Sequence, residues 1–212
     1  MNRSGRTLLS LALCAALGLS ACSLGLESHG EVIAPTPGAD PSPRVFLPAN
    51  APSISQHFRR FSDEQSQPQG AQDHLGVDIV APKGTPVIAA MDGVVVASHF
   101  HPLFGNEVIL EHSPLPDGRK LRTVYKHLSS RSAEVGNIVR RGDVLGGLGR
   151  SGVVSSGILH LHFEVLAGEG YKAEALDPNR YWIGGQGRVT CFSQQRNFPK
   201  TGLRLTYPVQ CR

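Results

Sequence analysis

The stretch Val87-Ile88-Ala89-Ala90-Met91-Asp92-Gly93-Val94-Val95-Val96-Ala97-Ser98 decides the fold class. Two short β-rich runs, 87–90 and 93–98, flank an Asp-Gly pair, which accepts the positive φ of a tight turn at little cost. Further β-rich runs follow between Gly and Pro breaks, at 107–111, 120–125, 132–139, 144–146 and 160–165. No stretch keeps a 3.6-residue period for three turns. The pattern predicts an all-β domain, built as a single antiparallel, barrel-like sheet with short loops.

The N-terminus is typical of a bacterial export signal. Arg3 and Arg6 form a positive segment, residues 7–19 are short and largely apolar, and Leu19-Ser20-Ala21-Cys22 supplies a small-residue cleavage site. A cysteine directly after the site resembles a lipobox, which implies that residues 1–21 are removed and Cys22 carries the lipid. The alternative is an ordinary secretory signal with an incidental cysteine. The apolar run is too short for a transmembrane helix, which needs about 20 residues.

The lipobox resemblance also implies a destination and a domain layout. Ser23 rather than Asp follows the cysteine, so we expect an exported cell-envelope lipoprotein, on the periplasmic face of the outer membrane if the host is Gram-negative. Residues 22–44 hold prolines at 35, 37, 41 and 43 and few apolar side chains, which predicts a flexible tether behind lipidated Cys22. The rest suits one domain with a single core, 45–182, followed by an extension, 183–212.

The charge balance argues against one class of partner. The whole chain has a formal net charge of +4, and removal of Arg3 and Arg6 with the signal leaves +2. So small a balance gives no argument for nucleic-acid binding. We therefore expect no nucleic-acid partner, membrane contact through the lipid anchor only, and a monomer.

The four cysteines divide by position. Cys14 lies in the signal and Cys22 is the expected anchor, so Cys191 and Cys211 remain in a compartment where disulfides persist. A bridge between them would close a loop of roughly twenty residues and stabilise the fold by about 3 kcal/mol in the chain-entropy model. The alternative is two unpaired buried thiols.

Two short histidine motifs together predict a divided zinc site. His74 is followed four residues later by Asp78, and His160 is followed two residues later by His162. In a strand the two imidazoles of a His-x-His lie on one face, so one can bind metal while the other reaches the attacking water. Hydrolytic zinc usually takes three protein ligands from His and Asp/Glu and keeps a fourth position for water.

With these motifs in view, the chain resembles the lysostaphin-type (LytM, M23) zinc metallopeptidases, which cut peptidoglycan cross-bridges. The resemblance covers about residues 54–182. Its other motifs, in chain order, are Ala81-Pro82-x-Gly84-Thr85-Pro86-Val87, Ala90-x-Asp92-Gly93-x-Val95, Gly105-Asn106, Tyr125-Lys126-His127-Leu128-Ser129, Arg141-Gly142-Asp143 and His160-Leu161-His162-Phe163-Glu164-Val165. A lone His-x-x-x-Asp or His-x-His is a weak signal, whereas the whole ordered set is specific.

The resemblance implies a role for each matched residue. His74, Asp78 and His162 correspond to the ligands of one zinc ion per chain. His160 corresponds to the general base, and His127 to a residue that steadies the oxyanion or transition state. Histidine suits both tasks near neutral pH. The implied partners are the peptide stems of peptidoglycan, cut between D-alanine and a diamino acid or, alternatively, at glycine bridges.

Two features depart from the family pattern. Between Gly152 and His160 the segment is about two residues longer than usual, and Leu159 stands where Pro is common, so the groove wall and the bond preference could differ. His99-Phe100-His101 is a second His-x-His, which we expect in a loop that could line the groove. His112 is expected to be structural, and His57 and His29 lie outside the motifs.

Two other functions compete with a peptidoglycan endopeptidase. Some relatives with degenerate sites are non-catalytic regulators that activate cell-wall amidases, but they lose the ligand set that this chain keeps. A zinc peptidase acting on proteins or free peptides is the third hypothesis.

Overall fold

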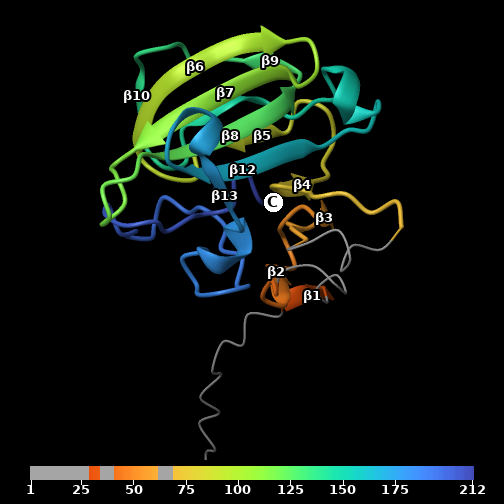
Figure 1. The fold of residues 1–212 in the computed structure, drawn as a ribbon. Helices are drawn as coiled ribbons and strands as arrows, with labels where there is room; N and C mark the ends of the chain where they lie inside the picture. The colour runs from red at the N-terminus through yellow and green to blue at the C-terminus, as the bar shows by residue number, and fades with distance from the viewer. Residues whose placement is uncertain (1–28, 34–40, 62–68) are drawn as a thin grey trace, which may run out of the picture.

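The computed structural model describes residues 29–33, 41–61 and 69–212 (Figure 1). Its centre is an eight-stranded antiparallel sheet with the order β10-β6-β7-β8-β12-β4-β3, and β13 also pairs with β12. Figure 1 shows β6, β7, β8 and β12 side by side. The strands of this sheet are β3 Ile54–Gln56, β4 Val77–Ile79, β6 Gly93–His101, β7 Gly105–His112, β8 Leu121–Leu128, β10 Ile138–Val139, β12 Leu161–Ala167 and β13 Glu174–Leu176.

The remaining strands form two smaller sheets. One has the order β5-β11-β9, and the other pairs β1 with β2. Their bounds are β1 His29–Ile33, β2 Val45–Pro48, β5 Pro86–Ile88, β9 Ser130–Arg131 and β11 Val144–Gly147, and three 3-10 turns complete the fold, η1 Val153–Ser155, η2 Gly170–Lys172 and η3 Pro178–Arg180. The described residues contain no α-helix, so the all-β, antiparallel expectation is confirmed. The strands are divided among separate sheets rather than gathered in one.

The Asp92-Gly93 turn does not close a hairpin. It connects β5 to β6, which belong to different sheets. The chain bends at Met91 and Asp92, but neither Asp92 nor Gly93 has the positive φ that the Asp-Gly pair led us to expect. A local turn signal also does not say whether the strands on either side pair with each other. That choice depends on which neighbours cover each strand.

The second His-x-His lies in a strand, which corrects the expectation of a loop. β6 continues through His101, and its end pairs with the start of β7, His99 opposite Glu107 and His101 opposite Gly105. Gly105 adopts a φ of 73°, a left-handed conformation that favours glycine and lets the chain turn straight back. The hairpin pairing extends the strand beyond the β-branched run that the sequence pattern detects.

The C-terminal segment belongs to the core of the domain. Leu205, Tyr207 and Val209 are fully buried, and Trp182 and Tyr207 form an edge-on aromatic pair 5.9 Å apart. Val209 pairs with Val87 in an isolated β-bridge, so the chain end lies against β5. Cys191 and Cys211 form the predicted disulfide, 20 residues apart in sequence. Residues 183–212 therefore share one hydrophobic core with the residues before them.

The N-terminal predictions lie largely outside the described residues. The export signal 1–21 and Cys22 are among the residues that the structure does not describe. Within the expected tether, His29–Ile33 forms β1 and pairs antiparallel with β2. The structure differs from the expectation at these five residues, which include the β-branched pair Val32-Ile33. Among the described residues, no helix is long and apolar enough to cross a membrane.

Candidate active site

His74, Asp78 and His162 meet where β4 and β12 lie side by side. Asp78 is in β4 and faces His162 of β12 directly across the antiparallel ladder. His74 precedes β4 and is fixed by a β-bridge to Arg59. Nδ1 of His162 lies 2.8 Å from Oδ1 of Asp78, and Nε2 of His74 lies 3.1 Å from that oxygen and 3.2 Å from Nδ1 of His162.

This triangle of donor atoms fits a tetrahedral zinc ion. Zinc–ligand bonds of about 2.0–2.1 Å at tetrahedral angles separate neighbouring donors by about 3.3 Å. The three edges of the triangle, 2.8, 3.1 and 3.2 Å, are close to that value. Two imidazoles and a carboxylate are also the donor set that zinc uses in hydrolytic sites. The structure thus brings together the three residues that the resemblance implied as ligands.

The two histidines each have a hydrogen-bond partner at the ring nitrogen outside the triangle. Nδ1 of His74 lies 2.9 Å from the carbonyl oxygen of His57, which can only accept, so Nδ1 carries the proton and Nε2 is free. Both ring nitrogens of His162 face a carboxylate, Nδ1 that of Asp78 at 2.8 Å and Nε2 that of Glu164 at 2.9 Å. A metal ion in the triangle would take the lone pair of Nδ1 and leave Nε2 as the donor to Glu164. His57, placed outside the motifs, therefore takes part through its backbone.

Asp78 is held ionised. Burial raises the pKa of the Asp78 carboxyl, but the ring nitrogens of His162 and His74 beside it outweigh burial and bring the pKa well below its usual range. A carboxylate at the triangle is the form that binds a cation, because a protonated acid has lost the charge and one lone pair.

His160 and His127 lie beside the triangle. Nδ1 of His160 donates to the carbonyl oxygen of Ile158 at 3.0 Å, and Nδ1 of His127 donates to that of Ser151 at 2.9 Å. Each ring thus uses Nδ1 as its donor, which leaves Nε2 available as an acceptor. Nε2 of His160 lies 3.8 Å from Oδ1 of Asp78, and the His127 and His160 rings are 4.7 Å apart. The arrangement offers two bases within reach of one point.

The backbone at His127 is unusual. Its φ of 64° is in the left-handed region, which few residues other than glycine adopt. Its amide donates to the carbonyl of Phe104 and its carbonyl accepts from Ser151, so the surrounding chain imposes the conformation. Strained residues of this kind concentrate at functional sites. Burial and the neighbouring His160 and His162 lower the pKa of His127 to about 4, despite the Ser151 hydrogen bond, which keeps the ring neutral at pH 7.

The five predicted site residues share a cavity of about 340 Å³ with side chains that the sequence analysis did not single out. The additional lining residues are Gln56, Asp73, Leu75, Phe104, Lys126, Val154 and Glu164. Two of them had a signal in the sequence. Glu164 is two residues after His162 in β12, and Lys126 is next to His127 in β8, so the period-two rule would have placed Glu164 on the face of His162.

The segment that departs from the family pattern forms one wall of this cavity. It contains η1, and Val154 lines the cavity while the amides of Val153 and Val154 donate to the carbonyls of Pro102 and Leu103. The longer segment is therefore fastened to the β6–β7 turn. Val153 and Val154 are exposed, which leaves an apolar edge beside the histidines.

The other histidines are not part of the triangle. His99 lies 3.6 Å from the Glu107 carboxylate, and Nδ1 of His101 accepts from the amides of Leu103 and Phe104 inside the turn. His112 is buried and hydrogen-bonded at both nitrogens, to the carbonyl of Asp92 and to Thr123, as expected of a structural histidine.

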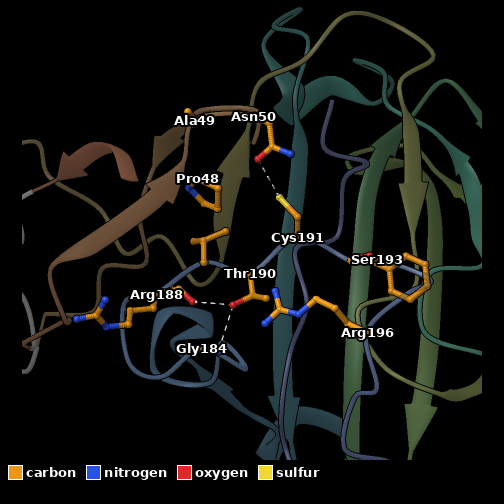
Figure 2. A pocket seen from close by; sticks show the side chains of 11 residues that line it. Pro48, Ala49, Asn50, Gly184, Arg188, Thr190, Cys191, Ser193 and Arg196 are labelled. Carbon is orange, nitrogen blue, oxygen red and sulfur yellow. Dashed lines mark hydrogen bonds between the residues drawn. The ribbon is translucent and has the colours of Figure 1, made fainter. Parts of the chain in front are cut away.

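A second cavity, of about 730 Å³, lies between residues 48–50 and the C-terminal segment (Figure 2). Figure 2 shows the side chain of Asn50 directed at Cys191 and that of Arg196 extending toward Thr190. The lining contains no histidine or carboxylate and no residue of the first cavity. It therefore lacks the imidazole and carboxylate groups that gather at the candidate active site.

Comparison with known proteins agrees with this geometry. Residues 72–178, just over half of the 212-residue chain, match the model of peptidase family M23. The chain is 42% identical over 93 residues to the peptidoglycan DD-endopeptidase ShyC of Vibrio cholerae. The aligned residues make up 44% of this chain and 20% of that protein. The chain is also 42% identical over 91 residues to the DD-carboxypeptidase/endopeptidase Mpg of Neisseria gonorrhoeae, 43% of this chain and 19% of that one. The chain thus spans about a fifth of the length of these relatives.

Two solved structures share the fold. The antimicrobial peptidase lysostaphin from Staphylococcus simulans superimposes with a TM-score of 0.53 at 28% identity, covering 72% of this chain and 58% of that one. A variant of the catalytic domain of the prophage-encoded M23 protein EnpA from Enterococcus faecalis gives a TM-score of 0.50 at 26% identity, with 63% and 98% covered. The family match, the motifs and the donor triangle lead to one conclusion: the chain belongs to peptidase family M23.

Proposed function

We propose that this protein is a zinc-dependent endopeptidase that hydrolyses the peptide cross-bridges of peptidoglycan. The observation that carries the proposal is the triangle of His74, Asp78 and His162, with the free Nε2 atoms of His160 and His127 beside it in one cavity. Histidines that only stabilised the fold would not have to line one cavity together with a carboxylate.

Each residue has a defined task in this proposal. His74, Asp78 and His162 would hold one zinc ion, which would polarise the scissile carbonyl and lower the pKa of a coordinated water. His160 accepts the water proton at Nε2, because its Nδ1 is committed to Ile158, and returns it to the leaving amine. His127 is protonated at Nδ1 and can donate from Nε2 only as a cation. It would therefore take up a proton from solvent at Nε2 as negative charge develops beside it, and as a cation it would stabilise that charge.

The substrate class is argued from the cavity and from the relatives. The cavity is open enough at about 340 Å³ for an extended peptide, and Leu75, Phe104 and Val154 give it an apolar side. Relatives at 42% identity are a peptidoglycan DD-endopeptidase and a DD-carboxypeptidase/endopeptidase. We therefore propose the bond between D-alanine and a diamino acid as the one that is cut, with glycine bridges as the alternative.

The location follows from the N-terminal motif rather than from the fold. We propose that cleavage before Cys22 yields a lipid-anchored monomer whose domain reaches peptidoglycan from the envelope membrane. Relatives named peptidoglycan DD-endopeptidases support an envelope location.

Digestion of purified, cross-linked muropeptides tests the function. The mature chain loaded with zinc should convert cross-linked dimers to monomers, and mass spectrometry of the products identifies the bond. The matched control is the same chain with zinc removed by a chelator and then restored.

The regulator hypothesis makes the opposite prediction. A chain that binds zinc stoichiometrically, releases no product from any muropeptide and stimulates a purified cell-wall amidase would be a regulator. Cleavage of casein or free peptides in preference to muropeptides would support the general peptidase.

A further inference from the structure

A row of polar side chains crosses the central sheet behind the metal site. His162 of β12 faces Asp78 of β4 on one side and Lys126 of β8 on the other. Directly opposed residues of neighbouring strands point to the same face, and so do residues two apart in one strand. Glu164 therefore shares this face with His162, Lys126 and Asp78. A row of this kind gives the metal ligands a second set of polar neighbours beside the triangle.

Glu164 contacts the ring nitrogen of His162 that does not face the triangle. Its Oε1 lies 2.9 Å from Nε2, whereas Nδ1 lies 2.8 Å from Asp78. A metal ion in the triangle would take the lone pair of Nδ1, and the proton of the neutral ring would then lie on Nε2, where Glu164 accepts it. Metal-binding histidines typically have such a partner, which fixes the tautomer and the ring orientation.

Lys126 in turn holds Glu164. Its Nζ lies 2.5 Å from Oε1 of Glu164 and 4.2 Å from the centre of the Phe104 ring. The lysine and the glutamate side chains are only 10% and 12% exposed, so the pair is largely shielded from water. A carboxylate that is buried without a cation would be costly to keep ionised. Burial raises the pKa of Glu107, which is a buried residue of β7, and the positive charge of Lys126 opposes that rise.

Gly76 shows how closely the chain covers this contact. A Cβ at Gly76 would lie 2.5 Å from the carbonyl oxygen of Phe163, 3.0 Å from Nε2 of His162 and 3.1 Å from Cγ of Glu164. The glycine between the two ligands His74 and Asp78 therefore leaves room for the His162–Glu164 hydrogen bond. Any larger residue would displace β12 or separate the two side chains.

We propose that Glu164 and Lys126 are positioning residues for metal binding: the Glu164 carboxylate holds His162 as the tautomer whose Nδ1 faces the triangle, and the Lys126 ammonium holds Glu164. Neither side chain is a ligand or a proton carrier in this assignment. It rests on the proposed function, because it takes His162 as a zinc ligand.

Zinc affinity of the purified mature chain tests the assignment without reference to turnover. Zinc-free protein would be titrated with zinc in competition with a chromogenic chelator. Loss of an outer partner of a metal-binding histidine typically costs about 10–100-fold in affinity, and we expect that loss for Glu164→Ala and Lys126→Met. Glu164→Gln, which keeps an acceptor for His162 but loses the ion pair, should fall between them and the parent. Lys126→Arg, which keeps the positive charge, should retain most of the zinc affinity of the parent.

The chain offers a matched control on the neighbouring strands. Arg122 of β8 forms an ion pair with Glu111 of β7 at 3.0 Å, away from the ligands, so Arg122→Met should leave zinc affinity unchanged. The unfolding free energy of each zinc-free variant would be measured as well. A merely structural role would lower stability while the folded protein bound zinc as the parent does.

The outcomes separate the two proposals. If the parent chain binds no zinc, the proposed function fails. If the parent binds zinc and the folded Glu164→Gln and Lys126→Met variants bind it equally well, only the positioning role is overturned. Should Glu164→Ala not fold, the isosteric Glu164→Gln decides the matter alone.

Discussion

Nδ1 of His162 lies 2.8 Å from Oδ1 of Asp78, its partner across β12 and β4, whereas Nε2 of His160 stays 3.8 Å from the same oxygen. The two histidines of one three-residue motif thus stand in different relations to the triangle. Nδ1 of His162 is one corner of the triangle, whereas Nε2 of His160 lies outside the triangle and beside it. The difference can be measured by separating metal content from turnover.

His162→Ala should lose zinc and activity together. Removal of one of three protein ligands leaves an incomplete tetrahedral site whose affinity for the metal falls steeply. Elemental analysis of the purified variant checks this, with the parent chain prepared in parallel. Full zinc occupancy in the variant would contradict the ligand assignment.

His160→Ala and His127→Ala should keep zinc near one per chain and lose turnover. A positioned base typically supplies about 10²–10⁴-fold, and His160→Ala is expected to lose at least that much. His127→Ala should also be slow, because it removes stabilisation of the transition state. Zinc content and muropeptide cleavage are measured on the same preparations. If His160→Ala sheds zinc while His162→Ala retains it, the two roles are exchanged.

The Cys191–Cys211 disulfide should stabilise the domain by about 3 kcal/mol, the chain-entropy value for a loop of this length. The Cys191→Ser/Cys211→Ser double variant removes the bridge without leaving an unpaired thiol. Urea unfolding of variant and parent gives the difference, and zinc binding of the folded variant should be unchanged. An identical unfolding midpoint for both proteins would show that the buried Leu205, Tyr207 and Val209 hold the segment unaided.

Cys22→Ala should abolish lipid anchoring and leave a folded domain. The prediction rests on the Leu19-Ser20-Ala21-Cys22 cleavage site and on the Pro-rich residues that follow. Membrane fractions of the expressing cells would be washed with high salt and probed for the protein. A variant that still partitions with the membranes would refute the lipobox interpretation.

His112 should make the protein less stable in mild acid. Burial lowers the pKa of His112 in the folded state below its ordinary 6.5, despite the hydrogen bond to Asp92. Below about pH 6.5 the unfolded chain binds a proton that the folded chain does not, so stability falls by up to about 1.4 kcal/mol per pH unit until the folded pKa is reached.

Comparison with His112→Gln isolates this contribution. The variant should be less stable than the parent at pH 7, because it loses one of the two buried hydrogen bonds, and the difference should narrow at pH 5. Urea unfolding of both proteins at the two pH values measures it. A difference that is the same at pH 5 and pH 7 would exclude His112 as the titrating group.

Much of the fold and the site follows from residue order. The short β-rich runs with their Gly and Pro breaks predicted an antiparallel all-β domain, and the family match confirms the resemblance to M23 peptidases. The residues implied as zinc ligands do meet, because Asp78 follows His74 closely and a His-x-His in a strand keeps both rings on one face. The disulfide between Cys191 and Cys211 was also predicted correctly.

What the sequence could not give is the register between strands. A period of two says which residues share a face, but packing decides which residue of one strand lies opposite which residue of another. The register places Lys126 and Asp78 on either side of His162. Pairing with β7 extends β6 to His101, and the choice of neighbouring strands puts β5 and β6 in different sheets. The type and order of the side chains proposed to bind zinc can be read from the chain alone. Their buried partners cannot, because pairing between strands that are distant in sequence brings those partners close.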